Sequence, residues 1–84
     1  MTIHEARFIL TEDNVSELLS LLENLARKDD TFDYEAVPVP DTPTANILGE
    51  DYKKVFGRAM WVKERLQKKG IHASFRMSKK QGAG

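Results

Sequence analysis

Cysteine is absent from this sequence of 84 residues. The absence excludes a disulfide framework, a thiolate zinc site, an iron–sulfur cluster and a thiol nucleophile. Histidine is scarce, and His4 and His72 stand near opposite ends of the chain without the spacing of metal ligands. We therefore expect no metal ion and no cofactor.

Catalytic motifs are also missing. No glycine-rich phosphate loop occurs, because Gly49, Gly57 and Gly70 are isolated from one another. The acidic pairs Glu12/Asp13 and Glu50/Asp51 stand at predicted helix starts, where negative side chains complement the helix dipole. No residue is assigned a catalytic role, and we expect a protein that is not an enzyme.

Long apolar runs are missing as well. None approaches the roughly 20 residues that a membrane-spanning helix requires. The first residues, Met1 to Arg7, contain no basic segment followed by an apolar one, so they do not resemble a signal peptide. We expect no membrane contact and a cytoplasmic protein.

The apolar residues that are present are enough to fold one small domain. Leu, Ile, Val and Phe make up a quarter of the chain, above the level of about 20% that is typical of disorder. The sequence predicts a single αβ domain over residues 1–78 and a flexible tail over residues 79–84.

Hydrophobic periodicity predicts five elements. Residues 3–10 alternate like a strand, and a helix follows to about residue 28, capped by Thr11 or Asn14. A second strand begins at Phe32. A second helix covers about residues 50–69, with Gly70 as its stop, and residues 71–78 alternate as the last strand. Within the second helix, Gly57 is interpreted as a point where another backbone approaches closely.

Residues 40–49 show no clear period. The sequence predicts a mobile loop there, with a single helical turn between Pro43 and Gly49 as an alternative. Pro38 and Pro40 lie just before it and favour a sheet edge or an extended exit from the second strand.

The resulting order is β-α-β-α-β. It predicts a two-layer α+β or α/β sandwich, with a three-stranded sheet and both helices packed on one face. A strand–helix–strand unit favours a parallel pair with a right-handed crossover. Because one face of the sheet would remain open, we also expect a homodimer formed through that face or through the sheet edge.

Charge is distributed unevenly along the chain. The formal net charge is zero, from 13 basic and 13 acidic residues. Residues 1–49 nevertheless contain ten acids and three bases, and residues 50–84 contain ten bases and three acids. The zero is thus a cancellation between an acidic half and a basic half.

The basic half contains a stripe at helical spacing. Its members are Lys54, Arg58, Trp61, Arg65 and Lys68, and Arg76 extends the cationic surface onto the last strand. Long cations that follow a phosphate backbone, with a ring for a base to stack on, are typical of nucleic-acid binding. The sequence therefore predicts a small, non-enzymatic regulatory protein that contacts nucleic acid through these residues.

Two other interpretations of the stripe remain open. An acidic protein surface would fit the same cations, so the chain is alternatively a protein–protein regulator or inhibitor that binds through the open sheet face or the basic helix. The cations also fit an ordinary solvated helix face, or attraction between the two oppositely charged halves of the chain.

Overall fold

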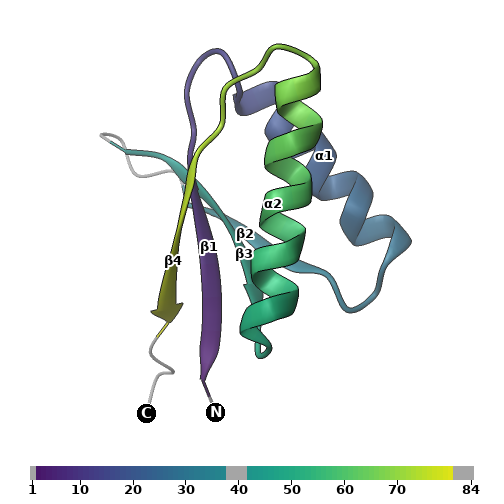
Figure 1. Ribbon diagram of the computed structural model, residues 1–84, viewed down its shortest axis with the longest axis vertical. Helices are drawn as coiled ribbons and strands as arrows, with labels where there is room; N and C mark the ends of the chain where they lie inside the picture. The colour runs from purple at the N-terminus through teal and green to yellow at the C-terminus, as the bar shows by residue number, and fades with distance from the viewer. Residues whose placement is uncertain (1, 38–41, 81–84) are drawn as a thin grey trace.

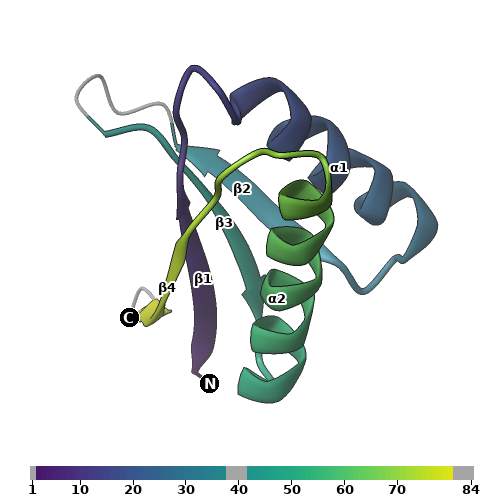
Figure 2. The same ribbon diagram turned by 45° about the horizontal axis from the view of Figure 1, so that its top comes forward.

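The computed structural model describes residues 2–37 and 42–80. In chain order its elements are β1 (Ile3–Ile9), α1 (Val15–Lys28), β2 (Asp33–Val37), β3 (Thr44–Gly49), α2 (Tyr52–Lys68) and β4 (Phe75–Lys80). The strands form one sheet in the order β2-β3-β1-β4, and every neighbouring pair is antiparallel. Both helices cover the same face of this sheet (Figures 1 and 2). The βαββαβ order with this topology is the split-βαβ, or ferredoxin-like, arrangement.

The two-helix, two-layer α+β arrangement was predicted correctly, but the predicted sheet was wrong in two respects. It has four strands rather than three, and it contains no parallel pair. β1 and β2 are not neighbours, because β3 lies between them. The prediction failed because β1 and β2 run in the same direction, so that without β3 they look like a directly paired parallel crossover.

The missing strand is β3, which occupies most of the predicted loop. Its residues Ala45 to Leu48 are all buried, including Asn46. A central strand that is buried on both faces shows no alternation between apolar and polar residues, so its period is invisible in the sequence. The alternative of a helical turn before Gly49 is also wrong. The predictions for Pro38 and Pro40 lie outside the described residues.

The helix boundaries agree with the predicted ones to within a few residues. Asn14 directly precedes α1 but makes no side-chain hydrogen bond to the helix, whereas Thr11 Oγ1 accepts a hydrogen bond from the Asn14 backbone N–H at 3.2 Å. Asp51 caps α2 by accepting hydrogen bonds from the backbone N–H groups of Lys53 and Lys54. Gly70 follows α2 with φ of 78°, which suits glycine and ends the helix. β4 starts at Phe75, later than predicted, and continues through residue 80 into the predicted tail.

The core lies between the sheet and the two helices. Its largest fully buried side chains are Phe8, Leu18, Leu22, Ile47 and Leu66. Apolar side chains of this size contribute about 1.5–3 kcal/mol each when buried, so their burial in this layer is the main favourable contribution to folding.

Gly49 and Gly57 have opposite surroundings. A Cβ atom at Gly49 would lie 2.8 Å from Cγ2 of Val55, so the end of β3 approaches α2 more closely than any other residue type allows. Nothing lies within 4 Å of a Cβ at Gly57. The predicted close approach at Gly57 is therefore wrong, and that position is an exposed point on α2.

The second face of the sheet carries no helix (Figure 2). Strand register places the following residues on it: Ile3, Glu5, Arg7, Ile9, Asp33, Glu35, Val37, Thr44, Asn46, Leu48, Arg76 and Ser78. Glu5 is buried there, and its Oε1 accepts hydrogen bonds from Arg7 Nη2 at 2.9 Å and from Ser78 Oγ at 2.8 Å. This open face is thus mostly polar.

Candidate functional site

Helix α2 holds five of the six predicted binding residues, because its apolar positions fix how it lies on the sheet. Val55, Ala59, Val62 and Leu66 are buried and face the sheet. The predicted stripe therefore lies along one flank of α2, roughly 100° around the helix axis from the buried face. This flank is the one that faces α1, as the contacts of Arg58 show.

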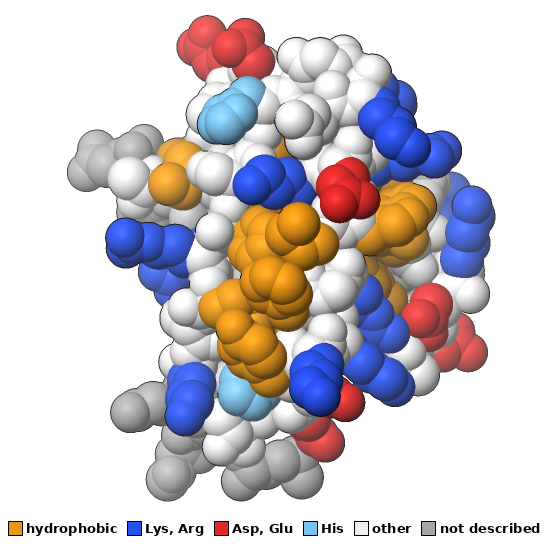
Figure 3. Space-filling view, viewed as in Figure 1, with side chains coloured by type: hydrophobic (Ala, Val, Ile, Leu, Met, Phe, Trp, Pro, Cys, Tyr) orange, Lys and Arg blue, Asp and Glu red, His pale blue; other side chains and the backbone are white. Residues whose placement is uncertain are grey.

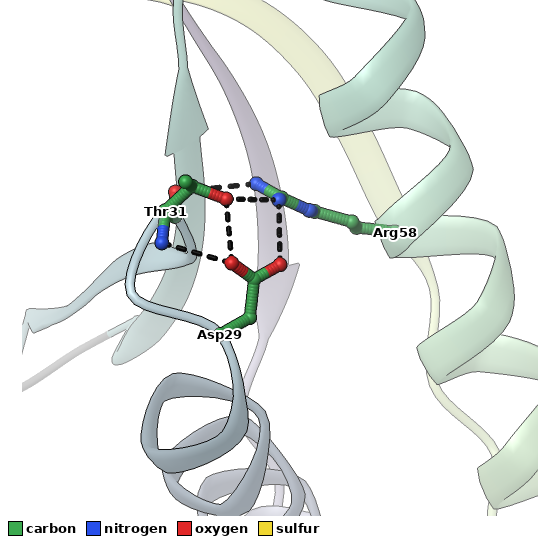
Figure 4. Close-up of polar contacts among 3 residues, drawn as sticks. All are labelled: Asp29, Thr31 and Arg58. Atoms are coloured by element: carbon green, nitrogen blue, oxygen red, sulfur yellow. Dashed lines mark hydrogen bonds and ion pairs between the residues drawn. The ribbon is translucent and has the colours of Figure 1, made fainter.

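Arg58 is engaged within the protein rather than directed into solvent (Figure 4). Its Nη2 lies 3.0 Å from Asp29 Oδ2 and donates to Thr31 Oγ1 at 2.9 Å, while Nη1 donates to the Thr31 carbonyl oxygen at 3.4 Å. The guanidinium also lies 5.4 Å from the centre of the Phe32 ring. Only 22% of the Arg58 side chain is exposed. We call Asp29, Thr31 and Arg58 the clamp.

The clamp is completed by the threonine between the two charges. Thr31 Oγ1 donates to Asp29 Oδ1 at 2.6 Å, and the Thr31 backbone N–H donates to the same oxygen at 2.9 Å. These two hydrogen bonds, followed by the charge of Arg58, hold the pKa of Asp29 below its ordinary value. The end of α1 is in this way joined to the middle of α2.

A second ion pair joins the two helices at the other end of α2. Lys69 Nζ lies 3.1 Å from Glu17 Oε2 of α1. Both this pair and the clamp connect the acidic half of the chain with the basic half. The attraction between the halves, which the sequence analysis left open, therefore accounts for part of the basic surface.

Trp61 and Arg65 form the exposed centre of the stripe. Trp61 is 44% exposed, and the Arg65 guanidinium lies over its ring at 5.6 Å from the centre. Lys54 and Lys68 are exposed one on each side, and within the described residues neither forms an ion pair. These four side chains are available to a partner, unlike Arg58. We call Lys54, Trp61, Arg65 and Lys68 the α2 interface.

The start of the α2 interface has carboxylates close by. Lys54 borders a surface hollow of about 430 Å³ that Asp33, Glu50 and Asp51 also line. Lys54 therefore has acidic side chains near it, whereas Lys68 lies in the last turn of the helix with another cation, Arg65.

Arg76 is separated from the other predicted residues. It lies on the open face of the sheet, directly opposite Arg7 of β1, whereas α2 covers the other face (Figure 1). The six predicted residues thus occupy three places: the α2 interface, the clamp and the open face.

The sequence analysis missed a set of exposed rings on the opposite flank of α2. Tyr52 is 48% exposed and Phe56 is 41% exposed. The His4 and Tyr52 rings are 5.5 Å apart, the Tyr52 and Phe56 rings 6.1 Å, and the Phe56 and Phe75 rings 5.8 Å. Figure 3 shows the result as an apolar band on this side of the molecule with Lys and Arg side chains around it.

The spacing of these rings in the sequence is that of core residues. Tyr52 and Phe56 are four residues apart and stand beside the buried positions of α2. They are exposed because β4, the strand next to them, is an edge strand, and α2 packs instead over β1 and β3.

Metal-binding clusters and membrane-spanning helices are both absent from the part of the chain that the structure describes. No group of three or more His, Cys, Asp or Glu residues there is arranged to hold a metal ion. No described helix is long and apolar enough to cross a membrane.

Comparisons with known proteins bear on the fold alone. No protein-family model matches the chain, and no curated protein matches it in sequence. Among solved structures, the chain is similar to the de novo designed protein Foldit4, with a TM-score of 0.56 and 16% identity, over 95% of this chain and 98% of that one. At this identity, the likeness supports the arrangement of helices and strands.

Proposed function

We propose that this protein is a small, non-enzymatic protein that binds single-stranded nucleic acid through helix α2. The observation that carries the proposal is the composition of the α2 interface: an exposed Trp61 with Arg65 over its ring, and Lys54 and Lys68 on either side. Proteins that bind single strands combine cations that track the phosphates with rings on which bases stack. Lys68, Arg65 and Lys54 take the first role and Trp61 the second.

The exposed rings on the other flank of α2 support a single-stranded ligand over a duplex. Bases can reach Tyr52 and Phe56 only when they are unpaired. Lys79 lies on the helix side of β4, because its register partner His4 contacts Tyr52. The rings therefore have a cation beside them as well.

The open sheet face does not provide the same chemistry. RNA-recognition motifs use a four-stranded sheet whose open-face aromatics stack bases. No aromatic residue lies on the open face within the described strands. For this reason we assign binding to the helix and not to the sheet.

Recognition of an acidic, apolar protein segment is the second candidate function. The apolar band formed by Tyr52, Phe56 and Phe75 favours it, because exposed patches of this kind mark contact sites. The two candidates differ at Trp61. Nucleic acid would contact the Trp61 ring, whereas an acidic, apolar protein segment would bind the Tyr52 and Phe56 flank of α2 and leave Trp61 uncontacted.

The experiment uses Trp61 as its own reporter, since it is the only tryptophan in the chain. An oligothymidylate of about ten nucleotides, within the usual site size, is titrated into the protein at several salt concentrations. We expect quenching of Trp61 fluorescence and an affinity that falls linearly with the logarithm of salt concentration.

A matched control distinguishes binding by the α2 interface from a general effect of positive charge. The double variant Lys54→Ala/Lys68→Ala should weaken binding, whereas Arg27→Ala/Lys28→Ala, which removes two exposed cations at the end of α1, should leave it unchanged. Unquenched Trp61 fluorescence at the lowest salt concentration contradicts the proposal. Equal losses in the two double variants contradict the assignment to α2.

A further inference from the structure

The two outer strands of the sheet differ in charge. β2 and β4 are the edges of the described sheet, so each has one side without a strand partner. β2 contains Asp33 and Glu35 and no basic residue, whereas β4 contains Arg76 and two lysines and no acidic residue. An unpaired edge is a template for a further strand, unless charge or cover prevents pairing.

Both acidic residues of β2 and Arg76 of β4 lie on the open face of the sheet, whereas Lys79 of β4 lies on the helix side. Asp33 and Glu35 pair with Leu48 and Asn46 on the open face, and Arg76 pairs with Arg7 there. Apart from Lys79 near the end of β4, the helix side of each edge is apolar. Tyr34 and Ala36 of β2, and Phe75 and Met77 of β4, alternate with the charged residues.

The strand directions permit the two edges to meet. Neighbouring strands are antiparallel throughout the order β2-β3-β1-β4, so β2 and β4 run in opposite directions. A second copy placed beside the first in the same orientation therefore brings its β2 antiparallel to β4. The helices of both copies then lie on one side of a continuous sheet.

One register satisfies both faces at once. With Glu35 of one copy opposite Arg76 of the other, Tyr34 falls opposite Met77 and Ala36 opposite Phe75. Cross-strand pairs of opposite charge, and apolar pairs that include an aromatic ring, each contribute roughly 0.2–1 kcal/mol. Asp33 then lies opposite Ser78, whose hydroxyl is a hydrogen-bond donor.

We propose that the protein associates with copies of itself, with β4 of one copy pairing with β2 of the next. Pairing between two β4 strands or two β2 strands is disfavoured, since it brings like charges together. The contact is heterologous, so it leaves a β2 and a β4 unpaired at the ends and does not close at a dimer. It goes beyond nucleic-acid binding and requires no ligand.

The test is sedimentation velocity of the protein alone at low salt over a range of concentrations. We expect the average mass to rise with concentration from the 9.6 kDa of one chain and to continue beyond twice that value. Higher salt should reduce the association, because Asp33 and Arg76 are exposed to solvent and Glu35 is only partly buried.

Two charge reversals identify the edges. Arg76→Glu and Glu35→Lys should each remain monomeric alone, because each places two like charges directly opposite one another at the Glu35–Arg76 position of the register. An equimolar mixture of the two should associate again. Lys28→Glu makes the same charge change as Arg76→Glu but at the end of α1, and it should associate like the unaltered protein.

Circular dichroism of each variant confirms that it is folded before its mass is measured. A chain that stays monomeric at every concentration overturns the proposal. The two edges would then contact solvent or other proteins rather than each other. Association that survives Arg76→Glu, or a mixture that stays monomeric, overturns the assignment to β2 and β4. None of these results depends on nucleic acid, so failure here is separate from failure of the proposed function.

Discussion

Arg58 and Lys68 belong to the same helical stripe, yet the fold treats them differently. Arg58 is held by Asp29 and Thr31 and is 22% exposed, whereas Lys68 is exposed and forms no ion pair within the described residues. The spacing along α2 is the same for both. They differ because the turn at the end of α1, far away in sequence, supplies the partners of Arg58. Helical spacing therefore identifies a surface but not which of its cations are available to a partner.

The comparison extends to the two glycines near α2. Gly49 touches the buried face of the helix, while Gly57 is exposed on it. The structure therefore divides α2 into positions that the fold needs and positions that it leaves accessible. The following predictions test that division, from the largest expected effect to the smallest.

Gly49→Ala should destabilise the protein by about 1–3 kcal/mol, the usual cost of overpacking a core. The added Cβ would meet the Val55 side chain at 2.8 Å, and Val55 is fully buried and cannot move aside easily. The measurement is urea unfolding followed by circular dichroism. An unchanged free energy of unfolding contradicts the tight contact between β3 and α2.

Arg58→Ala should lower the free energy of unfolding clearly, although by less than Gly49→Ala, because it breaks the clamp. Lys54→Ala is the matched control from the same stripe and should stay within about 0.5 kcal/mol of the unaltered protein. If both alanine variants unfold at the same urea concentration, Arg58 does not differ from the accessible cations.

Gly57→Ala should stabilise the protein by about 0.5–1 kcal/mol, since alanine is the better helix former and no neighbour obstructs its Cβ. The same unfolding experiment measures it. A loss of stability at this position would indicate a close neighbour that the structure does not contain.

Thr31→Val should raise the pKa of Asp29 more than Arg58→Lys does, because the Thr31 hydroxyl is the largest cause of the lowered pKa. A group whose pKa is lowered by folding stabilises the folded state above its ordinary pKa. That contribution is lost as the pH falls through the lowered value. NMR titration of the Asp29 carboxyl group in both variants gives the comparison, and a larger rise in Arg58→Lys contradicts it.

The sequence was sufficient for elements with a one-sided pattern. The α1 helix, the α2 helix and the two faces of β1 follow from alternating or helical spacing, because each has an apolar face in the core and a more polar face away from it. β3 was missed because both of its faces are buried. Without β3, neither the strand order nor the antiparallel pairing could be derived.

The candidate site was predictable only in part, for a related reason. Composition and spacing indicated the cations of α2 and Trp61, but not the clamp, which depends on a contact between residues 29 and 58. Tyr52 and Phe56 have the spacing of core residues and are exposed because β4 ends the sheet beside them. Such features depend on tertiary neighbours, which local pattern does not encode.

The salt dependence of oligothymidylate binding, measured by Trp61 fluorescence, tests the central claim most directly. Each cation that contacts a phosphate of a single strand adds about 0.7 to the slope of log affinity against log salt. We predict that Lys54→Ala/Lys68→Ala lowers this slope by about 1.4, as two such contacts would, while Arg58→Gln leaves it unchanged. A slope that falls in Arg58→Gln and stays constant in the lysine variant would contradict the division of α2 into clamp and interface.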